Sequence, residues 1–434
     1  VDMNGPSGGG STYKVRYWEK RKRCWTFLVE PDQMLADKYG ITTLEQLVDT
    51  VIKVYDESYP EYAGTYDKNR YDDPNHPLRK FVMYHILPFQ VQDYDHFTYL
   101  PNIIKNRHKT NLIDPEDYFE TFLAHSLIRF SRVMTNGADK AGIYINRRGV
   151  GPSHDGELGR PYVRGARIYS DEEMAKYKNV GCNGYFYFID DLLLYSKFVR
   201  EDVLMRRLRI DCCTLSPDFM TSGARQNPGN YQGMGFKNPM YFKSYATDYM
   251  MWVRYCDTNN WSYEADGLDF YGTFDILLKL PPVPFDGTWE FRLSYRGDET
   301  CGVVQNYVGD NPDDLKPCGI PTDLTVGADE NYVIHWVSDK DLIEEGGEEL
   351  VIAHDKSMRN RGYMKGPDSH SNGTDVMRDI NTMARRIVTT DYFYADRDYY
   401  LRMKLVTQGI KATMNFDYME WCPKSIYSID EDRH

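Results

Sequence analysis

Two stretches far apart in the chain decide how it folds: Phe81-Val82-Met83-Tyr84-His85-Ile86-Leu87-Pro88 and Asn183-Gly184-Tyr185-Phe186-Tyr187-Phe188-Ile189-Asp190-Asp191-Leu192-Leu193-Leu194. The first belongs to a predicted helix that begins near Pro77 and stops at Pro88, because proline cannot continue a helix. The second is a run of aromatic and apolar residues opened by Asn-Gly, which predicts a β-hairpin. We expect this hairpin to close the first of two folded units.

The segments around these stretches add further helices. Residues 44–52 place Leu44, Leu47, Val48, Val51 and Ile52 on one apolar stripe, with Thr43 and Gln46 in the positions of a capping box. Residues 112–130 predict another helix, whose inward residues would be Phe119, Phe122, Leu123 and Leu127.

A first strand and helix entry are expected at Trp25-Thr26-Phe27-Leu28-Val29-Glu30-Pro31-Asp32-Gln33. Together with the two opening stretches, this segment resembles the conserved pieces of a fasciclin (FAS1) domain. That resemblance implies a protein of adhesion and binding, without catalysis. It also implies packed structural roles for the matching motif residues, which are Tyr84, His85, Asn183, Gly184 and Asp190.

In the second half of the chain, the pattern of apolar and polar residues has a period of two. Apolar and polar residues alternate over 289–296, 401–405 and 414–418, which indicates half-buried strands of a β-sandwich. The last of these, with the hairpin region 276–290, is similar to galactose-binding-like jelly rolls. The predicted fold class is therefore α+β, an N-terminal fasciclin-like α/β domain followed by an all-β sandwich.

The same reading divides the chain into four segments. Residues 1–13 are expected to be a flexible leader, because Gly, Ser and Pro dominate them. Residues 14–196 would be the fasciclin-like domain, 197–222 a charged helical linker, and 223–434 the sandwich.

Charge excludes one class of partner. The 434-residue chain has a net charge of −13, which repels phosphate backbones, so nucleic acid is not expected as a partner. The basic cluster Arg206, Arg207 and Arg209 is interpreted as a solvated face. No apolar run is long enough to span a bilayer.

The expected setting is the cell surface. The combination of a fasciclin-like domain with a sandwich resembles surface lipoproteins of Bacteroidetes that accompany SusC/SusD-type uptake systems. This implies an outer-membrane transporter or lipoprotein complex as partner, and a glycan as ligand. The leader is compatible with a lipid anchor, although the sequence contains no anchoring cysteine within it. The 36 tyrosines fit either an exposed binding surface or a strand-rich fold.

No motif for catalysis or for a cofactor is present. The chain lacks a nucleophile elbow, a zinc-protease motif, a phosphate loop and a dinucleotide fingerprint, so no catalytic residue and no cofactor are predicted. The run 368–379 approaches a calcium loop but has His370 where an oxygen ligand belongs, so no metal site is predicted.

A sugar-binding sandwich needs aromatic platforms beside polar side chains. The candidate ligand-binding residues are Trp252, Trp261, Trp336, Arg359, Asn360, Arg361 and Tyr363. Three functions remain open: a non-enzymatic surface protein that captures glycan or docks to partners, a glycoside-active enzyme with carboxylates in the sandwich, and a pure scaffold. The absence of catalytic motifs favours the non-enzymes.

Overall fold

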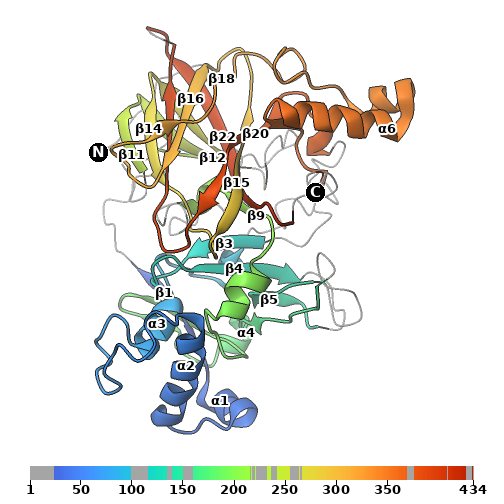
Figure 1. Ribbon diagram of the computed structural model, residues 1–434. Helices are drawn as coiled ribbons and strands as arrows, with labels where there is room; N and C mark the ends of the chain where they lie inside the picture. Colours follow the sequence, from blue (N-terminus) through green and yellow to red (C-terminus); the bar gives the residue numbers. More distant parts are fainter. Residues whose placement is uncertain are drawn as a thin grey trace.

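The chain is described by a computed structural model dominated by β-strands (Figure 1). The structure describes residues 24–98, 116–133, 139–149, 160–215, 217, 220, 232–235, 242–254, 263, 266–368, 376–407, 409–426 and 433. Within these residues the strands form four sheets. Two large sheets make up the upper part of the molecule in Figure 1, and two four-stranded sheets with most of the helices make up the lower part.

The larger sheet has eight strands. Its order is β10 (Gln232–Gly235), β12 (Tyr249–Arg254), β13 (Asp266–Gly272), β22 (Ala412–Pro423), β15 (Gly287–Arg296), β20 (Met383–Phe393) and β19 (Tyr363–Met364), with β9 (Leu208–Asp211) paired to β22. The six-stranded sheet has the order β11 (Phe242–Ala246), β14 (Asp275–Lys279), β21 (Tyr400–Leu405), β16 (Val303–Gly309) and β17 (Lys316–Pro317), with β18 (Thr322–Asp323) paired to β16. Long-range antiparallel pairs build both sheets.

A shared apolar core holds these two sheets together as the predicted β-sandwich. Phe291 and Trp421 contribute to it from the larger sheet, and Leu401 and Met403 from the smaller one. The alternation over 401–405 is confirmed, since Leu401, Met403 and Leu405 are buried there. Residues 289–296 differ from the prediction of a half-buried strand, because the polar residues Glu290, Arg292 and Ser294 are buried as well.

The lower part begins with a sheet in the order β2 (Ile86–Leu87), β1 (Trp25–Val29), β8 (Gly184–Phe188) and β7 (Val180–Gly181). β1 pairs in parallel with β8 and antiparallel with β2, so it lies between the two stretches quoted at the outset. The helices α1 (Asp32–Tyr39), α2 (Leu44–Ser58) and α3 (Pro77–Tyr84) lie at this end of the molecule (Figure 1). The capping box of Thr43 and Gln46 at the start of α2 is confirmed.

The second small sheet has the order β3 (Glu116–Glu120), β4 (Leu127–Val133), β5 (Gly142–Ile145) and β6 (Ala166–Arg167). It lies between the helical end and the sandwich (Figure 1). The remaining short helices are η1 (Tyr94–Phe97), α4 (Asp171–Met174), η4 (Val199–Val203), η5 (Cys212–Leu215) and η7 (Met377–Asp379), and the long α6 (Asp339–Asn360) flanks the sandwich.

The predicted fold class is wrong, because the described residues form mostly sheets and contain no distinct α/β fasciclin domain. The helix predicted over 112–130 is replaced, in its described part, by the hairpin of β3 and β4. Every residue of β4 is buried, and Leu127, Ile128 and Phe130 join the core cluster that also contains Trp421. The β3–β4 hairpin therefore shares the core of the sandwich, whereas the helical end has two smaller clusters of its own, one on α2 and α3 and one at α1.

The segment predicted as a helical linker, 197–222, is also different. It contains the π-helical turn η4 and the strand β9, which pairs with β22 from Trp421 to Tyr418. Its basic cluster is not a solvated face: Arg206 pairs with Glu116, and Arg207 and Arg209 pair with Glu420.

Glu420 is the centre of a buried ion network on β22. Its carboxylate is fully buried and accepts hydrogen bonds from Arg209 (2.8 Å), Arg292 (3.3 Å) and Arg385 (3.3 Å), which come from β9, β15 and β20. Burial alone would raise the pKa of Glu420, but the surrounding guanidinium groups lower it well below its usual value. The carboxylate therefore stays ionised and joins four strands through charge-assisted hydrogen bonds.

We predict that Glu420→Gln lowers the free energy of unfolding by about 3–5 kcal/mol, because it leaves several buried guanidinium groups without their counter-charge. Denaturant unfolding of the full chain measures this. Asp49→Asn is the control, since it removes the exposed Asp49–Lys68 pair, and should cost about 1 kcal/mol or less. Equal losses in the two variants would contradict the central role of Glu420.

Candidate functional site

The structure describes the side chains of five of the seven ligand-binding residues proposed from the sequence. Trp261 lies outside the described residues, as does the side chain of Trp252 on β12. Trp336 is buried, with the Nζ of Lys365 5.5 Å from its ring centre. The four others, Arg359, Asn360, Arg361 and Tyr363, surround the end of α6.

Those four do not form an exposed aromatic platform. Tyr363 is 2% exposed, and its ring lies beneath the guanidinium of Arg386 at 4.5 Å. Arg359 donates to Glu290 at 2.6 Å. Asn360 is exposed at the last turn of α6, and Arg361 is its C-cap.

The fasciclin-motif residues make internal contacts. The hydroxyl of Tyr84 donates to the carbonyl of Leu127 at 3.1 Å, and the Nε2 of His85 lies 2.8 Å from Glu30. Burial lowers the pKa of His85, but Glu30 reverses this and leaves the pKa above its usual value.

The hairpin residues of the motif also contact their neighbours. The carbonyl of Asn183 accepts from Trp25 at 2.9 Å. Gly184 has φ 153°, and a Cβ there would approach the Trp25 carbonyl to 1.8 Å. Asp190 pairs with Arg164 and Arg167. The motif residues are therefore engaged in contacts within the protein.

A different surface has the composition of a binding site. We call it the aromatic sheet face and define it as Tyr245, Asp275, Tyr307, Tyr400 and Arg402, on the outer side of the six-stranded sheet. The guanidinium of Arg402 lies 5.0 Å from the ring centre of Tyr245 and 5.7 Å from that of Tyr307. Tyr245 is 45% exposed, so this stack opens to solvent.

Asp275 fixes the arginine at the centre of this face. Its two carboxylate oxygens accept from Nε and Nη2 of Arg402, both at 2.6 Å. This bidentate pair holds the guanidinium plane in one orientation. Strand alternation places Arg402 there, because Leu401 and Met403 on either side turn into the core. The candidates from the sequence missed this face, because they were aromatic and polar residues of mixed segments and not the outward positions of the alternating strands.

Lys279 adjoins the aromatic sheet face beside Tyr400, on the side toward the lower part of the molecule. It pairs in register with Tyr400, and its ammonium lies 3.1 Å from Glu120 and 3.0 Å from Asp398. Asp398 in turn lies 3.0 Å from the Nε2 of His125. Alternating charges therefore connect the sandwich to the β3–β4 hairpin.

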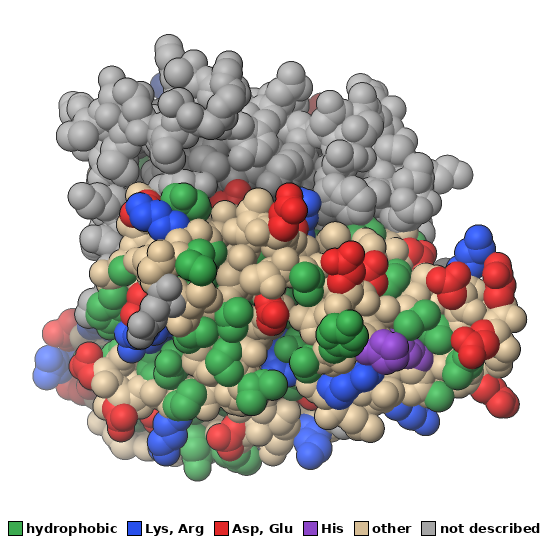
Figure 2. All heavy atoms as spheres, turned by 90° about the horizontal axis from the view of Figure 1, so that it is seen from above, with side chains coloured by type: hydrophobic (Ala, Val, Ile, Leu, Met, Phe, Trp, Pro, Cys, Tyr) green, Lys and Arg blue, Asp and Glu red, His purple; other side chains and the backbone are tan. Residues whose placement is uncertain are grey.

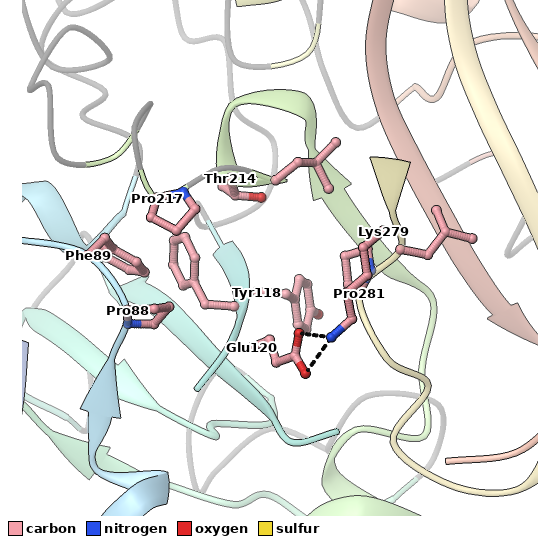
Figure 3. A pocket seen from close by; sticks show the side chains of 11 residues that line it. Pro88, Phe89, Tyr118, Glu120, Thr214, Pro217, Lys279 and Pro281 are labelled. Atoms are coloured by element: carbon pink, nitrogen blue, oxygen red, sulfur yellow. Dashed lines mark hydrogen bonds and ion pairs between the residues drawn. The ribbon is translucent and has the colours of Figure 1, made fainter. Parts of the chain in front are cut away.

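A pocket adjoins the face at Lys279 (Figure 3). Phe89, Tyr118 and Phe119 line it from the lower part of the molecule, and Leu280 and Pro281 line it from the sandwich. The pocket encloses about 440 Å³, including the part that opens to solvent. In Figure 3 the ammonium of Lys279 reaches Glu120 along one edge, so the polar groups of the pocket bond to each other.

Asp398, one of the two carboxylates beside Lys279, does not have the property of a glycosidase acid. A glycosidase acid must hold its proton near neutral pH. Burial would raise the pKa of Asp398, but Lys279 and His125 lower it below its usual value. Burial raises the pKa of Asp171 on α4, and it raises the pKa of Asp269 on β13 to about 6. Asp269 lies on the other large sheet and accepts from Asn415 at 2.7 Å.

Asp269 generates a pH-dependent stability. Burial raises its pKa from 3.8 to about 6, so the stability of the protonated form is fully present below pH 4 and is lost as the pH rises through 6. We predict that Asp269→Asn unfolds like the parent near pH 4 but is more stable by roughly 1–3 kcal/mol at pH 8. Thermal or denaturant unfolding across this range measures the difference. The exposed control Asp314→Asn should track the parent at every pH. A constant offset for Asp269→Asn would contradict the raised pKa.

Comparisons with known proteins are distant. No family model matches the chain, so the resemblance to fasciclin domains has no support there, and no curated protein matches it either. Among solved structures, an adhesin domain of Lys-gingipain from Porphyromonas gingivalis W83 is similar over 45% of this chain and 99% of its own, at 11% identity and a TM-score of 0.22. An exo-β-1,3-galactanase from Phanerochaete chrysosporium is similar over 68% of this chain and 54% of its own, at 8% identity and a TM-score of 0.21. At these TM-scores the similarities carry no argument about function.

Proposed function

We propose that this protein is a non-enzymatic carbohydrate-binding protein, whose β-sandwich holds a short oligosaccharide against the aromatic sheet face. The observation that carries this proposal is the stack of Arg402 between Tyr245 and Tyr307, fixed by Asp275. No catalytic residue is assigned to this face.

The chemistry of the face suits a sugar. The apolar C–H side of a sugar ring packs on an aromatic ring, and hydroxyl groups bond to guanidinium donors and carboxylate acceptors. Arg402 and Asp275 supply both kinds of polar group beside Tyr245. Because their mutual bonds already fix both side chains, little conformational entropy is lost when a ligand binds.

The dimensions of the face suit an extended ligand. β11, β14, β21 and β16 are neighbours in that order. Three inter-strand spacings of about 4.8 Å span roughly 14 Å, the scale of a short oligosaccharide. A strand surface of this kind is rigid, so the aromatic rings keep their spacing without a ligand.

We further propose that binding takes place at the cell surface, with an outer-membrane uptake complex of SusC/SusD type as partner. The tyrosine-rich composition supports an extracellular binding role. No helix among the described residues is long and apolar enough to cross a membrane. Co-purification of the intact protein with such a complex tests the partnership, and recovery without any transporter component contradicts it.

Tyrosine replacement tests the proposed surface. A glycan array followed by calorimetry on the full chain should find saturable binding, and Tyr245→Ala or Tyr307→Ala should weaken it about tenfold or more, because stacking area is lost. Tyr332→Ala is the control, since Tyr332 is 98% exposed and lies elsewhere. A reducing-sugar assay should detect no release. Sugar release that survives in these variants would contradict the non-enzymatic function.

A charge-conserving change tests the role of Arg402. We predict that Arg402→Lys weakens glycan binding about five- to tenfold with little change in stability, because an ammonium lacks the planar fork that pairs with Asp275. Arg397→Lys is the matched control: Arg397 covers Tyr394 at 4.2 Å and pairs with Asp310 at 3.3 Å, on an exposed hairpin. If Arg397→Lys alone weakened binding, the site would lie at that hairpin.

A further inference from the structure

A second pocket lies against the larger sheet, away from the aromatic sheet face. It is bounded by α6, the β19 region, η7 and β20, and it encloses about 320 Å³, including its open part. Six of its eight lining residues are cationic: Lys356, Arg359, Lys365, Arg378, Arg385 and Arg433. Asp355 is the one acidic residue among them.

The positive charge of this lining is opposite in sign to the net charge of the chain, which is −13. It is also opposite to the exposed side of α6, which carries Glu344, Glu345, Glu348 and Glu349. Figure 2 shows acidic side chains gathered toward the end of the molecule where α6 lies in Figure 1. Buried cations need negative charge nearby, and Glu290 supplies it for Arg359 and Glu420 for Arg385.

Some of these cations are held firmly in place. Lys365 has a fully buried side chain and donates to Asp339 at 2.6 Å. Arg378 donates to the same carboxylate at 3.1 Å and to Asp355 at 2.5 Å. Two carboxylates therefore position the positive groups, as the outer shell of an anion site does.

Arg433 supplies donors that the described residues do not use. Its Nη1 bonds to Glu348, and its Nε lies 3.5 Å from Asp355. Its Nη2 is buried and has no hydrogen-bond partner among the described residues. A buried N–H of a guanidinium group normally has an acceptor, so this one calls for an oxygen atom from a ligand.

We propose that this pocket binds a tetrahedral oxyanion, a sulfate or phosphate group, either as the free ion or as a monoester on a larger molecule. Arg433 and Lys356 would contact the group directly, while Lys365 and Arg378 would supply fixed positive charge. Arginine and lysine are the side chains that recognise such groups. The pocket uses none of the residues of the aromatic sheet face, so the proposal is independent of the glycan-binding function.

Calorimetric titration of the full chain tests this proposal. Sodium phosphate, sodium sulfate, a phosphate monoester, a sulfate monoester and acetate are each added at an ionic strength held constant with sodium chloride. We expect saturable one-site binding of a tetrahedral oxyanion, with acetate much weaker. The double variant Arg433→Ala/Lys356→Ala should bind about tenfold or more weakly, because two charged donors are lost. Lys340→Ala, an exposed lysine of α6 outside the pocket, should change the affinity less than twofold.

The titrations with free ions and with monoesters identify the source of the oxyanion. Tighter binding of a monoester than of its free ion assigns the pocket to an esterified ligand, and the reverse assigns it to the ion. Circular dichroism and the thermal midpoint without anion show whether the double variant is folded. The proposal is overturned if no oxyanion binds above the chloride background, or if the folded double variant binds as tightly as the parent.

Discussion

The fold depends on one buried carboxylate. Glu420 lies on β22 in the interior of the larger sheet and neutralises guanidinium groups from β9, β15 and β20. Because β9 comes from the first half of the chain, its pairing with β22 joins the two halves of the sequence in one sheet. The apolar core also joins the two halves of the sequence, since one cluster of buried side chains includes residues from Leu28 to Trp421.

This arrangement explains which parts of the fold could be predicted from the sequence. Alternation over 401–405 and a capping box at Thr43 are local patterns, and both are confirmed. The hairpin of β3 and β4 was missed because Phe119, Leu123 and Leu127 match a helical period. In β4, arginines such as Arg129 are buried against partners distant in sequence, so charge was not a signal of exposure there.

The candidate site follows the same logic. Aromatic residues chosen by polar surroundings, such as Trp336, are buried in the structure. The aromatic sheet face depends on which strands are neighbours, and the neighbours of β21 are β14 and β16, each far from it in the chain. Alternation alone shows that Arg402 points outward, but its contacts with Tyr245 and Asp275 depend on strand register.

The most direct test of the central claim is hydrogen exchange of the full chain with and without a glycan that binds. The account predicts slower exchange in peptides from β11, β16 and β21, which present the aromatic sheet face, and unchanged exchange in peptides from β20 and the hairpin that follows it. Protection confined to the hairpin around Tyr394, or to α6, would contradict the assignment of glycan binding to this face.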